Sequence, residues 1–201
     1  MANPFNETVA AWVAGQGDAE LRLGNDTISA SDFEWSRNGA PGIYAPKSRS
    51  ILTRLSSKTS NDAAIVIGDS GVPTGGRRKW LVESSAKKPI LFLGDLDGVD
   101  ISIYCSLINR PAPAGLKYLG ICDNLLDAFD VSLTSLEGYM FPVTAIEVAA
   151  IRTLGLLGFD VEAIVGPRCL SVLRAGKKLE LEGLLWEISA DKVLKYAMDF
   201  T

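Results

Sequence analysis

Two aspartates separated by a single residue form the motif in this chain that most suggests chemistry. Asp95 and Asp97 follow the apolar run Pro89–Leu93 and lie between two glycines, in the turn Gly94-Asp95-Leu96-Asp97-Gly98. Two carboxylates at the end of one strand can both reach a single hard cation, which relieves their mutual repulsion in a partly desolvated site. The turn therefore predicts a site for a divalent cation, and its oxygen ligands suit Mg²⁺, Mn²⁺ or Ca²⁺.

The same aspartates have a structural alternative. Asp is a preferred residue at the start of a helix, because its side chain accepts a hydrogen bond from a backbone N–H of the first turn. Asp97 or Asp100 could therefore cap the helix expected from Val99 to Ile108. The flanking glycines and the wholly apolar strand before the turn favour metal binding over the cap.

A glycine-rich loop precedes the aspartate turn. It reads Gly68-Asp69-Ser70-Gly71-Val72-Pro73-Thr74-Gly75-Gly76 and opens a helix that carries Arg77 and Arg78. Backbone N–H groups at a helix start, with arginines close behind, suit a phosphate group. The loop matches neither a Walker A motif nor a GxGxxG fingerprint, so an ordinary turn between strand and helix is the alternative.

The composition narrows the possible chemistry. The chain has 201 residues, no histidine, three scattered cysteines and a net charge of −4. Without histidine there is no Ser-His or Cys-His relay, and carboxylates are left as the principal metal ligands. A negative total charge does not favour nucleic-acid binding, although local basic clusters can still attract phosphate. Lys177 and Lys178 belong to one such cluster.

Alternating strand and helix patterns must position these residues. Uninterrupted apolar strands are typical of a parallel sheet that is buried on both faces. We therefore expect an α/β fold with an open, mainly parallel four-stranded sheet flanked by helices. The expected strands are Gly42–Ala45, Ala63–Ile67, Pro89–Leu93 and Leu116–Leu119, and the expected helices are Lys47–Leu55, Thr74–Ser84, Val99–Ile108, Val143–Leu157 and one near Asp191–Met198.

The first forty residues have a different pattern. Pro4–Ala14 has apolar residues at helical spacing, Glu20–Ser29 is typical of a small hairpin, and a short helix is expected to end near Arg37. We expect residues 1–40 to form a helix-hairpin appendage and residues 41–201 to form the α/β domain. The start lacks the features of a signal peptide and no apolar run is long enough to span a bilayer, so we expect a cytoplasmic protein with no membrane contact.

Together the loops resemble the Toprim domain, a Rossmannoid metal-dependent fold of topoisomerases and related nucleases. The most similar branch is that of the topoisomerase VI A subunit, its meiotic double-strand-break relatives and the Wadjet-type plasmid-defence nuclease subunit. The motifs that carry the resemblance are the glycine-rich turn with Arg77-Arg78, the acidic turn Gly94–Asp100, Tyr118-Leu119-Gly120 with Asp123, and Gly176–Leu184 with its Lys-x-Glu pattern. The resemblance covers residues from Gly42 to the C-terminus.

The resemblance implies a metal-dependent, nuclease-like protein that acts on DNA phosphodiesters. It implies Asp95, Asp97 and Asp100 as ligands of Mg²⁺ or Mn²⁺, and Arg77, Arg78, Lys177 and Lys178 as contacts to DNA phosphates. The first strand of the family ends in a catalytic glutamate, whereas this chain has Tyr44-Ala45-Pro46-Lys47 at that place. Asp69 could substitute for that glutamate as a catalytic group.

Two other functions remain open at this point. One is a degenerate Toprim domain that binds DNA or a partner subunit in a larger complex without cutting, and the missing glutamate favours it. The other is a site for a nucleotide or a sugar phosphate. The oligomeric state and the identity of a partner are left open by the sequence.

Overall fold

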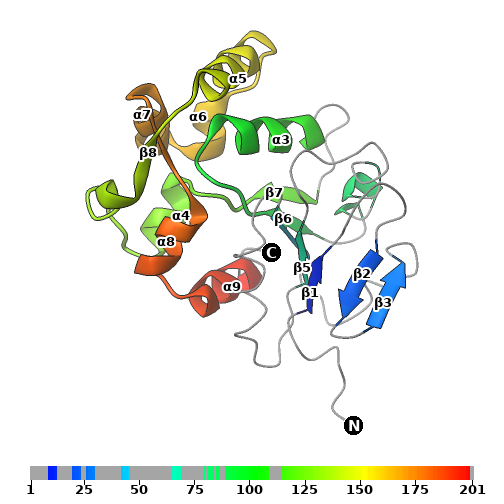
Figure 1. Cartoon of the computed structure of the whole chain (residues 1–201). Coiled ribbons are helices and arrows are strands. Elements are labelled where there is room, and N and C mark those ends of the chain that lie inside the picture. The colour runs from blue at the N-terminus through cyan, green and yellow to red at the C-terminus, as the bar shows by residue number, and fades with distance from the viewer. Residues whose placement is uncertain are drawn as a thin grey trace. The chain divides into compact units, whose positions relative to one another are not determined.

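The chain folds as a mixture of helices and strands (Figure 1). The computed structural model describes the backbone of residues 9–12, 20–23, 26–29, 42–45 and 65–68, and then residues 79, 81–83, 85, 86, 89–108 and 115–199. Two compact units are present: Met1–Phe92 with Pro111–Lys117 and Ala190–Thr201, and Leu93–Arg110 with Tyr118–Ser189. The predicted division at residue 40 stays a prediction.

The first unit contains most of a five-stranded sheet with the order β1-β5-β4-β6-β7. β4 lies parallel to both β5 and β6, with Gly42 opposite Ile65 on one side and Ile90 on the other. All residues of β6 are buried, as expected of a strand in the interior of a sheet. The strands are β1 (Val9–Trp12), β4 (Gly42–Ala45), β5 (Ile65–Gly68), β6 (Ile90–Phe92) and β7 (Leu116–Tyr118).

The N-terminal prediction needs a correction. Val9–Trp12 is not helical but forms β1, which lies parallel to β5 with Val9 opposite Ile65. The sheet therefore has five strands where four were expected. Apolar residues at helical spacing suggested a helix, but Val and Trp also suit strands, and pairing with β5 satisfies the backbone of this segment. This is a long-range contact that local periodicity does not report.

The expected hairpin is confirmed. β2 (Glu20–Leu23) and β3 (Asp26–Ser29) pair antiparallel, with Glu20 opposite Ser29 and Leu23 opposite Asp26. The two-residue connection Gly24-Asn25 is the turn chemistry that such hairpins favour. The short helix expected to end near Arg37 and the helix expected over Lys47–Leu55 lie outside the described residues.

The second unit is mainly helical. Helix α3 packs against α5, and the short strands β8 and β9 pair antiparallel, with Met140 opposite Leu179. Its elements are α3 (Gly98–Ile108), α4 (Asp123–Ala128), η1 (Glu137–Tyr139), β8 (Met140–Pro142), α5 (Ala145–Leu156), α6 (Val161–Val165), α7 (Pro167–Arg174), β9 (Lys177–Leu179) and α8 (Leu181–Glu187). The predicted helices 99–108 and 143–157 are thus confirmed as α3 and α5. The last predicted helix is α9 (Ala190–Asp199), in the first unit.

Helix α5 starts at a capping box. The Thr144 hydroxyl accepts a hydrogen bond from the Glu147 backbone N–H at 3.3 Å, and the Thr144 N–H donates to Glu147 Oε2 at 2.5 Å. This reciprocal pair satisfies two backbone donors that the first helical turn leaves without partners. It also fixes the Glu147 carboxylate at the start of α5.

Candidate functional site

The aspartate turn lies directly after β6 and is held by a short strand from far along the chain. Leu96 exchanges two backbone hydrogen bonds with Leu179 of β9, at 2.9 and 3.2 Å. The side chains of Asp95, Asp97 and Asp100 are all buried. The turn is therefore a packed part of the second unit, as its apolar flanks suggested.

Asp97 caps helix α3. Its Oδ1 accepts hydrogen bonds from the backbone N–H groups of Val99 at 2.8 Å and Asp100 at 2.7 Å. These are donors of the first helical turn, and the favourable end of the helix dipole faces the carboxylate. The capping role that the sequence left as an alternative is thus present in the structure.

Asp95 and Asp100 also accept hydrogen bonds from the backbone. Asp95 Oδ1 accepts from the N–H of Leu181, the first residue of α8, at 2.8 Å. Asp100 Oδ2 accepts from the Asp95 N–H at 2.9 Å. Each of the three predicted ligands therefore has at least one carboxylate oxygen bound to a backbone donor. These carboxylates connect the acidic turn to α3 and α8.

The fit of this turn to a divalent cation is mixed. Carboxylate oxygens are the donors that Mg²⁺ prefers, but the backbone N–H groups compete for them here. Among the described residues, no group of three or more His, Cys, Asp or Glu side chains is arranged to hold a metal ion. The metal role of Asp95, Asp97 and Asp100 remains a prediction.

Lys178, one of the two predicted phosphate contacts on β9, forms an ion pair inside the protein. Its Nζ lies 2.9 Å from Glu147 Oε1, and the side chains of Lys178 and Glu147 are only 18% and 6% exposed. The hydrogen bond to Glu147 raises the pKa of Lys178, helped by the charges of Glu147, Asp97 and Glu180. Lys177, by contrast, is exposed.

Glu147 is a residue of this site that the sequence reasoning missed. Burial favours its neutral form, but hydrogen bonds from the Thr144 N–H and from Lys178 outweigh burial and lower its pKa. The Thr-x-x-Glu spacing of the capping box was a readable signal for its position. The ion pair between Glu147 and Lys178 could not be predicted from the sequence, because the two residues are far apart in the chain.

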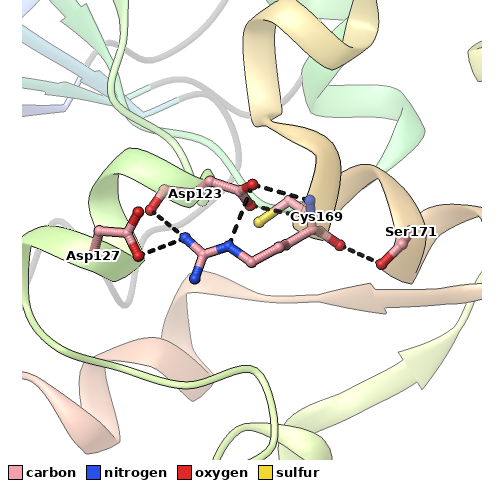
Figure 2. Close-up of polar contacts among 5 residues, drawn as sticks. Asp123, Asp127, Cys169 and Ser171 are labelled. Atoms are coloured by element: carbon pink, nitrogen blue, oxygen red, sulfur yellow. Dashed lines mark hydrogen bonds and ion pairs between the residues drawn. The ribbon is translucent and has the colours of Figure 1, made fainter.

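A second polar cluster joins α4 to α7 (Figure 2). The Asp123 carboxylate accepts hydrogen bonds from the backbone N–H groups of Arg168 and Cys169, both at 2.9 Å. The Arg168 guanidinium donates to the Asp123 carbonyl at 3.2 Å and to Asp127 Oδ1 at 2.5 Å. Burial opposes ionisation of Asp123, but the two backbone donors and the Arg168 charge lower its pKa overall. Asp123 is thus an internal anion at the start of α7.

Helix α5 exposes large apolar side chains. Ile146, Leu156 and Leu157, at its two ends, are 75%, 82% and 68% exposed. Beside α5 lies a cavity of about 520 Å³. Its apolar lining includes Val148, Ile151, Phe159, Leu170 and Leu173.

The other predicted site residues have no described position. Asp69, Arg77 and Arg78 lie outside the described residues, so their predicted roles stay predictions. No helix among the described residues is both long and apolar enough to cross a bilayer. A scan against family models and a search of curated proteins found no match to this chain.

Proposed function

We propose that this chain is a Toprim-like α/β domain that acts as a protein-interaction module in a larger complex, with α5 as its contact surface. The Toprim assignment is supported by the order of the motifs along the chain and by the acidic turn that directly follows the buried strand β6. Folds of this class support many activities, so the function has to be argued from the sites themselves.

The exposed apolar surface of α5 carries the proposal. Only Glu147 and Leu154 of this twelve-residue helix are fully buried, whereas Ile146, Leu156 and the following Leu157 are largely exposed. Single exposed apolar residues are common, but several large ones on one element are typical of a surface that another protein covers. A partner that covered α5 would remove these side chains from water, which stabilises the complex.

The polar groups favour a non-catalytic role. The carboxylates of Asp95, Asp97 and Asp100 bind backbone N–H groups, and the charge of Lys178 is paired with Glu147. The chain also lacks an acid at Tyr44-Ala45-Pro46-Lys47, where the Toprim resemblance places a catalytic glutamate. These groups hold the domain together.

The test compares the assembly state of the chain in its native cells with that of a variant. Leu156→Ser with Leu157→Ser removes the apolar side chains without touching the core, and Thr153→Ser on the same helix is the control. We expect the natural chain and the control to run in cross-linked complexes well above 21.5 kDa, and the double variant to run as the isolated chain. A natural chain recovered only at its own mass would contradict the proposal.

A metal-dependent nuclease is the second candidate. Its support is the burial of Asp95, Asp97 and Asp100 within one turn at the end of β6. A bound Mg²⁺ would stabilise negative charge that develops on a phosphodiester. Plasmid cleavage in MgCl₂ or MnCl₂ that is lost in Asp95→Asn would establish this function, whereas a gel shift that persists in EDTA without cleavage would indicate DNA binding alone.

A further inference from the structure

The acidic turn and the start of α5 approach each other closely. A Cβ atom added to Gly98 would lie 2.4 Å from the backbone oxygen of Glu147, so only glycine fits at this position. Asp97 precedes Gly98 in the chain, and the packing of α3 on α5 therefore brings the Asp97 and Glu147 backbones into one region. The carboxylates of Asp97 and Glu147 are both buried.

A third element brings a cation to the same place. β9 pairs with β8, with Lys178 opposite Phe141, and its Leu179 bonds to Leu96 of the acidic turn. This double attachment fixes the backbone of Lys178 beside the turn. Its Nζ is 2.9 Å from Glu147 Oε1, and the negative charge of Asp97 also acts on it.

The charges of Asp97, Glu147 and Lys178 affect the stability of the fold at this place. A carboxylate removed from water is strongly destabilising unless a positive charge or hydrogen-bond donors compensate it. Backbone donors supply part of the compensation, through Thr144 to Glu147 and through α3 to Asp97. An ammonium group on a flexible stem can supply the rest, because it is a compact point charge with three donors.

We propose that the Lys178 ammonium is the built-in cation of this site, neutralising Glu147 and Asp97 in the position where a divalent metal ion would otherwise act. In the natural chain, MgCl₂, MnCl₂ and EDTA then leave the stability unchanged. Removal of the ammonium leaves the buried Glu147 carboxylate without its cation and opens the site to an added cation. This inference concerns the interior of the second unit and does not depend on the contact surface of α5.

The experiment measures the thermal unfolding midpoint in EDTA and in millimolar MgCl₂ or MnCl₂. The natural chain is compared with Lys178→Met, which keeps the length and removes the charge, and with Lys177→Met on the exposed neighbouring position. We expect Lys178→Met to unfold roughly 5–10 °C lower in EDTA and to regain part of that loss in MnCl₂. The natural chain and Lys177→Met should show no change with metal.

Several results would overturn the inference. One is a natural chain whose midpoint rises with MnCl₂ as much as that of Lys178→Met. Another is a Lys178→Met variant that is as stable as the natural chain, or that is destabilised and gains nothing from MnCl₂. If Lys178→Met does not fold, the double variant Glu147→Gln with Lys178→Met tests the inference instead. The double variant should fold, because it lacks both charges of the ion pair. If neither variant folds, the role of Lys178 is packing and not charge.

Discussion

At the residue scale, Asp97 of the acidic turn acts either as a helix cap or as a metal ligand. Replacing one of its carboxylate oxygens with an amide nitrogen tests which role it has. Asp97 Oδ1 accepts hydrogen bonds from the Val99 and Asp100 N–H groups. An asparagine keeps an oxygen in this position but loses the negative charge that a metal ion needs. The substitution Asp97→Asn therefore distinguishes the two roles. It keeps the helix cap, because Asn caps a helix as well as Asp does, but it weakens the binding of a metal ion.

We expect Asp97→Ala to lower the free energy of unfolding by about 1–2 kcal/mol, because the first turn of α3 loses its acceptor. Asp97→Asn should lose clearly less. Urea unfolding of both variants, followed by circular dichroism in EDTA, measures the difference. Equal losses for the two variants would indicate that the charge of Asp97 matters more than its capping oxygen.

Gly166 offers a second test at the residue scale. It has φ +85°, and a Cβ added there would lie 2.4 Å from Asp123 Cγ. Gly166→Ala therefore meets both a left-handed backbone and the Asp123 side chain, and we expect a loss of about 2–4 kcal/mol in unfolding free energy.

Gly158 is the matched control for this substitution. It has φ +82° and nothing within 4 Å of an added Cβ. Gly158→Ala should cost only the backbone strain, about 1 kcal/mol. Similar losses at the two positions in chemical denaturation would mean that the contact with Asp123 is unimportant.

At the scale of elements, one carboxylate connects two helices. Asp123 belongs to α4, and its oxygens bind the N–H groups of Arg168 and Cys169 at the start of α7. Arg168 then returns to α4 through Asp127. The sequence distance between the helices means that folding must bring them together before these bonds form.

The lowered pKa of Asp123 predicts acid sensitivity. Because the pKa in the folded chain lies below the ordinary value of 3.8, the ionised carboxylate stabilises the fold fully above that value. The stabilisation is lost as the pH falls below 3.8 through the lowered pKa. We expect Asp123→Asn to unfold more easily at neutral pH and to lose less further stability in acid than the natural chain.

Thermal unfolding between neutral pH and about pH 3 checks this prediction. Asp130→Asn is a suitable control, because Asp130 is exposed and has φ +53°, a conformation that Asn tolerates well. An acid dependence that is unchanged by Asp123→Asn would assign the pH effect to other carboxylates, of which Glu147 is the first to examine because its pKa is also lowered.

At the scale of the whole molecule, the exposed apolar side chains of α5 should stabilise association with a partner protein. They should contribute little to the free energy of unfolding of the chain itself. We expect Leu156→Ser with Leu157→Ser to change the unfolding free energy by less than about 1 kcal/mol, because both side chains are largely exposed. Leu154→Ser, on the buried side of the same helix, should lose at least about 3 kcal/mol. Denaturant unfolding of the purified chain measures both. A large loss in the double variant would show that these leucines are packed inside the protein.

The sequence alone determined the features that depend on neighbouring residues. The apolar run before Gly94 predicted the buried strand β6, the Gly-Asn pair predicted the β2–β3 hairpin, and the apolar spacing of residues 143–157 predicted α5. In each of these segments the local conformational preference and the tertiary environment favour the same structure.

Only the tertiary structure decided the rest, because it depends on groups that are distant in sequence. Val9–Trp12 forms the strand β1 because it pairs with β5. Lys178 is mostly buried, unlike an exposed basic residue, because it forms an ion pair with Glu147. The backbone donors around Asp95 and Asp97 come partly from Leu181, a residue at the start of another helix. Periodicity reports which face of a segment is apolar, but it does not report which charge or strand edge will meet it.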